Sequence, residues 1–464
     1  MNGGRIGRVI RFTSRRMIRR LRSWDGAFRR WVRPVSGPVR RAVARQVAFL
    51  RALARIALHR DDPALDRPAF RQPMRVALYS PSSFNTIDGS SVWLQSTARA
   101  LHEDPRLGIV IPLRADDARG VFTDGLRRLD RVALVDSARF RFGAKDLPVA
   151  GVIRMLRWLD ARARFDIVIL RSYRVCLAAA NAGAFAGRLW SAYIWEPERD
   201  ARDAAYVDGM RVIARASRYV IVQTRRVGAE VERLVPEAAG KILLISPAIP
   251  SREGSPLPKP RQRLLYTGKL VPHYRFEELV SLFTTLRSDY PDLEFHVAGD
   301  KIPAQKDDPD YRRRILRLLQ ESPGLVWHGG IAREAVMDLL GEGGVALNVW
   351  DPAYAEGLND LVVPSKTLEY CAAGVPAVVQ RTTAHEDMLG SAYPFLVSGV
   401  ADAEQAVRRL LSDEATYRDA ARRARESAEA FSYESVYAGL KPALDGAVGV
   451  DTAGEARRAS GAAR

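Results

Sequence analysis

Residues 363–379 (VPSKTLEYCAAGVPAVV) place a lysine and a glutamate three positions apart at the start of a predicted helix. Pro364 suits a first helical position, so the backbone amides near Ser365 and Lys366 form an anion site, and the Lys366 ammonium adds a positive charge. Glu369 lies on the same helical face one turn later, where its carboxylate can accept hydrogen bonds from ribose hydroxyls. The pattern fits a nucleoside diphosphate, and it fits equally a plain helical ion pair on the surface.

The chain around this segment alternates short β-rich runs with helical stretches, which is the pattern of α/β proteins with parallel sheets. Residues 246–262 interrupt the alternation, because five prolines there exclude a regular helix or strand. The strands that we expect are residues 76–79, 109–113, 132–135, 167–170, 191–195, 219–223 and 242–245 before this break, and 264–267, 294–298, 326–328, 345–349 and 377–380 after it.

We therefore expect two Rossmann-like, doubly wound parallel-sheet domains that face each other across a cleft. The carboxyl ends of parallel strands meet at one edge of each sheet, where such sheets bind nucleotides and phosphates. A ligand that bridges the domains is the expectation. The predicted division is a basic helical extension with a linker at 1–72, a first domain at 73–250, a linker at 251–262, a second domain at 263–430, a C-terminal helix at 431–447 and a disordered tail at 448–464.

Residues 363–379 resemble the donor-binding signature of the family 4 glycosyltransferases (glycosyl transferases group 1), which have the GT-B fold. The resemblance extends to residues 266–270 (YTGKL), 297–300 (VAGD) and 326–330 (VWHGG). It implies a nucleoside-diphosphate-sugar donor in the second domain and an acceptor in the first. It also implies that basic side chains, rather than a metal ion or another cofactor, neutralise the diphosphate leaving group. The residues implied for the donor are Gly268, Lys269, Arg275, Ser365, Lys366 and Glu369.

The segment before the signature departs from the family pattern. The position eight residues before Glu369, where many members carry a second glutamate, is Leu361. Glu356 is followed by a glycine as in the family, but the pair lies five residues too early. Glu356, Asn359 and Asp360 are the candidates for contacts with the donor sugar and its α-phosphate.

In the first domain, the turn Asp88-Gly89-Ser90-Ser91 precedes a helix that we expect from Val92. Its backbone amides can approach the donor phosphates or the acceptor, although an ordinary helix cap by Ser90 or Ser91 fits as well. Glu196 follows a predicted strand near the position of a His-Asp pair in relatives. It is our candidate catalytic residue facing the acceptor hydroxyl, with a surface carboxylate as the alternative.

The net charge of +18 is concentrated in residues 1–72, where 19 arginines and 4 aspartates give +15 and leave +3 for the rest. Within residues 5–33 arginines surround an apolar helical stripe, which predicts an amphipathic helix on an anionic membrane surface. A disordered basic tail, a transit peptide and a nucleic-acid arm are the alternatives, of which we do not favour nucleic acid. The stripe consists of Ile6, Ile10, Met17, Leu21, Trp24, Phe28 and Trp31.

Cysteine and histidine positions give no sign of a disulfide framework or a metal site. The two isolated cysteines fit a reducing, cytoplasmic setting. Together with the basic segment at 5–33, the family resemblance implies an enzyme on the inner face of the cell membrane that moves a hexose-type sugar to a lipid-linked or polysaccharide acceptor. Family resemblance implies retention of anomeric configuration and no metal. The alternatives are a catalytically silent GT-B scaffold with a membrane- or nucleic-acid-binding arm, and another GT-B enzyme such as a sugar-nucleotide epimerase.

Overall fold

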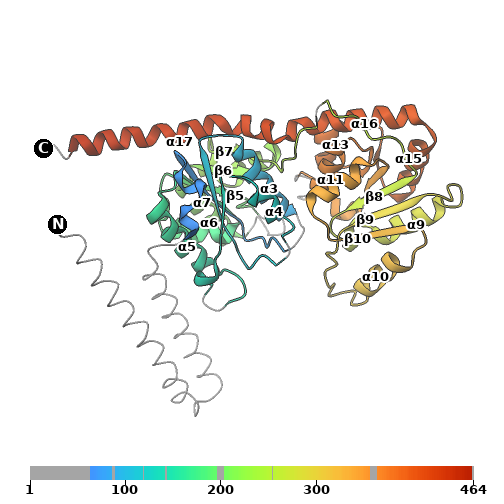
Figure 1. Ribbon diagram of the computed structural model, residues 1–464, viewed down its shortest axis with the longest axis horizontal. Helices are drawn as coiled ribbons and strands as arrows, with labels where there is room; N and C mark the ends of the chain where they lie inside the picture. Colours follow the sequence, from blue (N-terminus) through green and yellow to red (C-terminus); the bar gives the residue numbers. More distant parts are fainter. Residues whose placement is uncertain are drawn as a thin grey trace, which may run out of the picture.

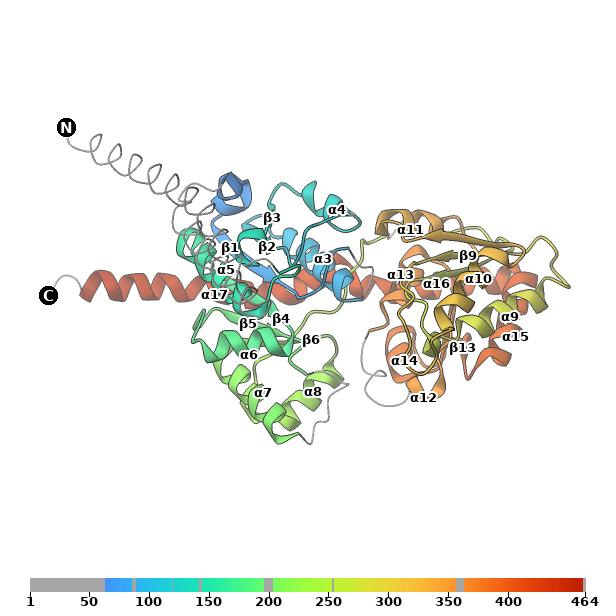
Figure 2. The same cartoon turned by 90° about the horizontal axis from the view of Figure 1, so that it is seen from below.

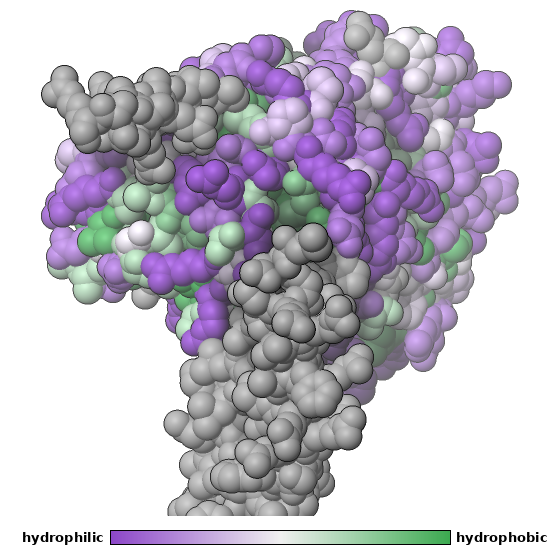
Figure 3. Space-filling view, turned by 60° about the vertical axis from the view of Figure 1, so that its left-hand side comes forward, coloured by the Kyte–Doolittle hydropathy of each residue, from purple (hydrophilic) through white to green (hydrophobic). Residues whose placement is uncertain are grey.

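The fold comes from a computed structural model, which describes residues 63–85, 89–118, 120–141, 144–195, 203–252, 254–355 and 363–461. Two α/β domains follow one another along the chain, and the red C-terminal helices run along one side of the molecule, α16 (Glu414–Ala428) over the second domain and α17 (Tyr433–Gly461) over the first (Figure 1). Figure 2 shows the same two bodies from below. On the face drawn in Figure 3, hydrophilic residues cover most of the coloured surface and hydrophobic residues form smaller patches between them.

Within the described ranges, the first domain contains a parallel sheet of seven strands, and its strand order is that of a doubly wound fold. In spatial order the strands are β3 (Val132–Val135), β2 (Leu107–Pro112), β1 (Met74–Tyr79), β4 (Ile167–Arg171), β5 (Leu189–Ala192), β6 (Tyr219–Val222) and β7 (Ile242–Leu244). The helices that follow the strands are α3 (Gly89–His102), α4 (Thr123–Arg127), α5 (Val149–Ala163), α6 (Tyr173–Asn181), α7 (Ala204–Ala216) and α8 (Arg225–Leu234).

The second domain contains a parallel sheet of six strands in its described part. In spatial order they are β10 (Leu325–Gly329), β9 (Glu294–Ala298), β8 (Arg263–Thr267), β11 (Val345–Asn348), β12 (Ala377–Gln380) and β13 (Leu396–Val397). Its helices are α9 (Phe276–Leu286), α10 (Tyr311–Glu321), α11 (Arg333–Gly341), α12 (Pro352–Ala355), α13 (Ser365–Ala373), α14 (Thr383–Leu389), α15 (Val400–Ser412) and α16 (Glu414–Ala428). The prediction of two doubly wound parallel-sheet domains is confirmed.

Alternate residues of each strand in the first sheet enter two different cores. Ile167 and Ile169 of β4 pack on the face that α3 covers, whereas Val168 and Leu170 pack on the face of α5 and α6. All four side chains are fully buried. Burial on both faces explains the continuous apolar runs of these strands, which is typical of parallel sheets between two helical layers.

The last helix, α17 (Tyr433–Gly461), returns from the second domain to the first (Figure 1). Tyr433, Val436, Leu440 and Leu444 belong to the apolar core that lies beneath α3. The prediction of a disordered tail from residue 448 is wrong for residues 448–461, which continue the helix. Alanine, glutamate and arginine in this stretch favour helix, whereas its glycines oppose it.

No helix in the described part of the chain is both long enough and apolar enough to span a bilayer. The basic segment at residues 5–33, for which the sequence predicts a membrane-surface helix, lies outside the described residues.

Candidate functional site

Helix α13 carries the lysine and glutamate of the sequence signature, and buried polar contacts hold its first turn. Pro364 caps the helix from the position before its first residue, one place earlier than the sequence predicts. The hydroxyl of Thr367 accepts a hydrogen bond of 2.9 Å from Asn348, at the end of β11, and lies 3.0 Å from Nε2 of His385. The helix therefore begins at a fixed place beside the carboxyl ends of the strands, with its amino-terminal amides facing the cleft.

The Lys366 ammonium lies between two aromatic rings. Its Nζ atom is 4.1 Å from the ring centre of Tyr266 and 3.7 Å from that of Tyr274, and it donates a hydrogen bond of 2.8 Å to the Tyr266 hydroxyl. Burial and the nearby Lys269 hold the pKa of Lys366 well below its usual range, while Glu369 opposes that shift. An anion that entered between the two lysines would remove this electrostatic penalty.

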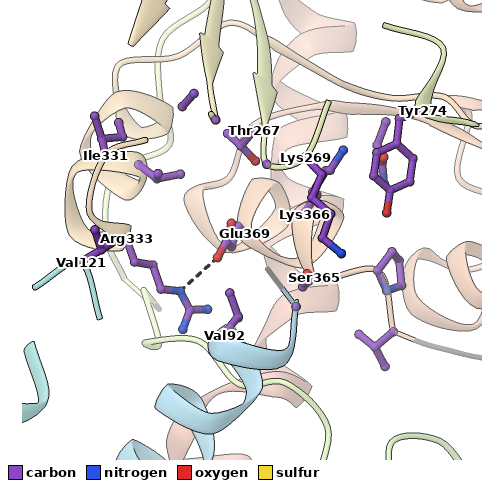
Figure 4. Close-up of a pocket in the computed structure, with 18 of the residues that line it drawn as sticks. Val92, Val121, Thr267, Lys269, Tyr274, Ile331, Arg333, Ser365, Lys366 and Glu369 are labelled. Carbon is purple, nitrogen blue, oxygen red and sulfur yellow. Dashed lines mark hydrogen bonds and ion pairs between the residues drawn. The ribbon is translucent and has the colours of Figure 1, made fainter. Parts of the chain in front are cut away.

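The loops after β8 and β9 approach each other so closely that only glycine fits. A Cβ atom on Gly299 would lie 1.9 Å from the carbonyl oxygen of Gly268, and one on Gly268 would lie 3.0 Å from Cε of Lys366. Gly268 has a φ of +102°, in the region that favours glycine. These two turns place the Lys269 side chain next to that of Lys366 (Figure 4).

Glu369 is nearly buried, one turn below Lys366, and forms an ion pair with an arginine from another helix. Nε of Arg333 donates a hydrogen bond of 3.0 Å to Oε1 of Glu369, shown as the dashed line in Figure 4. Burial raises the pKa of Glu369, and Arg333 and Lys366 oppose the rise. The carboxylate lines the pocket and retains the capacity to accept further hydrogen bonds.

The first domain closes the pocket from the opposite side. Gly89, Val92, Val121 and Phe122 line it together with the residues of the second domain (Figure 4). A Cβ atom on Gly89, the first residue of α3, would lie 3.8 Å from the hydroxyl of Ser365, the first residue of α13. The amino-termini of two helices, both of which favour anions, therefore meet across the cleft.

The structure brings six of the predicted site residues to this pocket: Gly89, Gly268, Lys269, Ser365, Lys366 and Glu369. Arg275 does not line it. Its side chain instead forms an ion pair of 3.2 Å with Glu278 on α9. Ser90 is the second residue of α3 and does not line the pocket either. The sequence predicts that this helix begins at Val92, but it begins at Gly89.

Asp88, Glu196 and Glu356 lie outside the described residues, as do Asn359 and Asp360. Their predicted roles toward the phosphates, the acceptor and the donor sugar stay predictions. Within the described ranges, no group of three or more His, Cys, Asp or Glu side chains is placed to hold a metal ion.

Sequence reasoning missed the aromatic and arginine partners of the signature. The sequence motifs include Tyr266 but predict no contact for its ring, and no motif predicts a role for Tyr274 or Arg333. Each lies at least 30 residues from the signature segment and acts through a side chain that the fold brings to it. One sequence signal could have pointed to Arg333. It is a single positive charge at the start of the helix that follows the glycine turn at 329–330.

Comparison with known families places this pocket in an enzyme class. Residues 249–427 match the model of the family described as Glycosyl transferases group 1, and this range contains β8 to β13 with the whole lysine and glutamate cluster. The match covers the second domain, and it supports a glycosyltransferase activity for the chain. The resemblance stated from the sequence and the prediction of an enzyme are both confirmed. No curated protein sequence matches the chain.

Solved structures agree with the GT-B fold of the glycosyltransferase. HepE from Anabaena, in complex with UDP and glucose, has a TM-score of 0.59 at 14% identity, over 80% of this chain and 100% of HepE. Sucrose-phosphate synthase from Thermosynechococcus elongatus has a TM-score of 0.59 at 16% identity, over 81% of this chain and 100% of its own. The trehalose-6-phosphate synthase OtsA has a TM-score of 0.54 at 13% identity, over 80% and 99% respectively. At these identities the likeness shows the fold.

Proposed function

We propose that the glycosyltransferase binds a nucleoside-diphosphate sugar between α3 and α13. The diphosphate lies at the two helix amino-termini, with Lys269 and Lys366 beside it, and the ribose hydroxyls bind Glu369. The observation that carries this proposal is the convergence of two lysines and two helix amino-termini on one cleft. The ammonium groups of Lys269 and Lys366 repel each other, and a dianionic ligand relieves that repulsion.

The chemistry follows from the charges in the cleft. In the transfer, the bond between the anomeric carbon and the diphosphate oxygen breaks, the acceptor oxygen bonds to that carbon, and the acceptor proton passes to the departing diphosphate. The leaving group gains charge as the bond breaks, so Lys269, Lys366 and the helix amides stabilise the transition state more than the ground state. We propose that this arrangement supplies the required charge without a metal ion or cofactor, and that the sugar retains its anomeric configuration.

For the acceptor we propose a lipid-linked or polysaccharide chain at the cytosolic face of a membrane. The basic, amphipathic residues 5–33 support this proposal, since they suit an anionic lipid surface. Residues 73–464 carry a net charge of only +3. This part of the chain therefore adds little to any general electrostatic attraction to nucleic acid.

Donor binding is the first test. Calorimetric titration of the full chain with UDP-, GDP- and dTDP-sugars is expected to reveal one donor with micromolar affinity. Lys366→Met and Glu369→Gln are expected to weaken that affinity by about tenfold or more, because each removes a charge-assisted contact of about 1.5–3 kcal/mol. Lys306→Met, which changes an exposed lysine away from the pocket, is the matched control. Absence of binding by every donor would favour the silent scaffold instead.

The identified donor then allows the chemistry to be tested. Hydrolysis or transfer with and without EDTA is expected to proceed at the same rate. A rate that EDTA abolishes and a divalent cation restores would contradict the metal-independent proposal.

A further inference from the structure

The Arg333 side chain bonds both domains at their junction. Arg333 opens α11, is 7% exposed, and its guanidinium donates hydrogen bonds to three separate parts of the chain. Nη2 bonds the carbonyl oxygen of Ala248 at 3.1 Å, Nη1 lies 3.5 Å from Oε1 of Gln95, and Nε bonds Glu369. The three partners belong to the crossover between the domains, to α3 of the first domain and to α13.

The partners of Arg333 are themselves fixed. Gln95 is 1% exposed, and its amide nitrogen donates to the carbonyl of Phe122, which lines the pocket. Ala248 is fully buried, and the neighbouring Ile249 pairs with Ser432 where the chain crosses back to the first domain. A planar guanidinium bonded on all sides has one orientation. The position of the Glu369 carboxylate therefore depends, through Arg333, on how the two domains meet.

We propose that Arg333 is a positioning residue for the donor, which holds Glu369 ionised and aimed into the pocket through contacts with both domains. The inference rests on the proposed function, in which Glu369 binds the donor ribose. A buried carboxylate without a partner takes up a proton and ceases to be an acceptor for two hydroxyls. Arg333 also couples the ribose contact to the arrangement of the domains.

A purely structural role for Arg333 predicts a loss of stability alone, whereas a positioning role predicts a change in the pH dependence of nucleotide binding. The titratable and charged groups that face Glu369 are Arg333 of α11, Lys366 and Tyr370 of α13, and Tyr433 of α17. Arg333 opposes the rise in the Glu369 pKa that burial causes. Its removal therefore raises that pKa further, and binding that needs the carboxylate is lost on the acid side at a higher pH than in the wild type.

The test is calorimetric titration of UDP, GDP and dTDP from pH 5.5 to 9 into the wild-type chain and into Arg333→Met, Arg333→Lys, Glu369→Gln and Arg99→Met. Arg333→Met is expected to weaken the tightest nucleotide about tenfold at pH 7 and to move the acid-side loss to higher pH. Glu369→Gln is expected to reduce the acid-side loss to the part that comes from protonation of the nucleotide's own terminal phosphate. Arg99→Met breaks a different ion pair between the domains, the 3.0 Å contact with Glu334, and is expected to behave as the wild type.

Three results would overturn the inference. If Arg333→Met has the affinity and pH profile of the wild type, the inference about Arg333 is contradicted and the proposed function stands. If the wild-type protein binds no nucleotide, the proposed function and this inference are both contradicted. If Arg333→Met does not fold, Arg333→Lys decides. Lysine keeps the positive charge but cannot bond three partners at once. We therefore expect Arg333→Lys to lose nucleotide binding at the same acid pH as the wild type, with a severalfold weaker affinity. Wild-type affinity of this variant would overturn the proposal.

Discussion

At the scale of single residues, the positive charge of Lys366 is unfavourably placed in the free protein. The ammonium is enclosed by two tyrosine rings, where cation–π contacts partly replace water, but burial and Lys269 still lower its pKa. A bound diphosphate brings negative charge to the same place and raises the pKa again. Nucleotide binding and protonation of Lys366 are therefore linked.

This linkage predicts proton uptake when the glycosyltransferase binds UDP or the nucleotide of its donor. Between the lowered pKa of the free protein and the higher pKa of the complex, affinity falls as pH rises, and below the lower value it does not depend on this group. Calorimetry in buffers of different ionisation enthalpy measures the uptake directly. Lys366→Met is expected to reduce it, and equal uptake by that variant and the wild type would exclude Lys366 as the source.

The sequence alone allowed the ligand class of Lys366 and Glu369 to be predicted, but not their partners. The alternative was an ion pair between Lys366 and Glu369 on the helix surface. In the structure Lys366 instead donates a hydrogen bond to Tyr266, and Glu369 accepts one from Arg333. Helical periodicity shows which residues share a face. It does not show which distant side chains the tertiary fold brings to that face.

At the scale of elements, α13 depends on how it ends as well as on how it begins. Gly374 follows its last turn with a φ of +71°, and Val375 and Gly374 donate hydrogen bonds back to the carbonyls of Tyr370 and Cys371. A Cβ atom on Gly374 would lie 2.6 Å from Nη2 of Arg425, which bonds the carbonyl of Ala373. The end of the signature helix is thus locked to α16.

Gly374→Ala is expected to lower the free energy of unfolding by more than the roughly 1–2 kcal/mol that a left-handed alanine costs, because the methyl group also displaces Arg425. Gly240→Ala is the matched control. Gly240 has a φ of +70°, but its Cβ position is open, so backbone strain alone applies there. Urea denaturation measures both variants. An equal loss in the two would mean that the contact with Arg425 contributes nothing.

The elements themselves could largely be predicted, since each buried strand is a short apolar run bounded by turn residues. Strand β13 (Leu396–Val397) was missed because two residues carry no periodic signal. The start of α3 was placed three residues too late, because Gly89 and Ser90 are poor helix formers that the fold nevertheless keeps helical.

At the scale of the whole molecule, α17 ties the two domains together. It leaves the second domain beside the outgoing crossover at Ile249 and packs against α3 (Figure 1). Its polar contacts with the first domain include Tyr437 with Asp104 at 3.2 Å and Asp445 with Arg106 at 2.7 Å. The extent of this helix could not be predicted from a composition that also suits a disordered tail.

Leu440→Ala is expected to destabilise the first domain by about 2–5 kcal/mol, because Leu440 is fully buried in the core beneath α3. Glu434→Ala, on an exposed position of the same helix, is expected to change the stability little. Thermal unfolding followed by tryptophan fluorescence separates the two. A Leu440→Ala protein as stable as the wild type would contradict the packing of α17 on the first domain.

Membrane binding is a prediction for the intact chain, since it concerns residues 5–33. The full protein is expected to sediment with anionic phospholipid vesicles, more weakly as salt increases, and to leave neutral vesicles unbound. Replacement of Trp24, Phe28 and Trp31 by serine is expected to abolish sedimentation with anionic vesicles. Retention by those vesicles in spite of the three substitutions would show that charge alone, without an apolar stripe, explains the attraction.

The central claim is that a nucleoside diphosphate binds where α3 and α13 meet. A crystal structure with the tightest-binding nucleotide tests it most directly. The account predicts the diphosphate within hydrogen-bonding distance of Lys366 Nζ and the first amides of α13, and a ribose hydroxyl on Glu369. A nucleotide bound elsewhere, with Lys366 still held between Tyr266 and Tyr274 and no phosphate near it, would contradict the account.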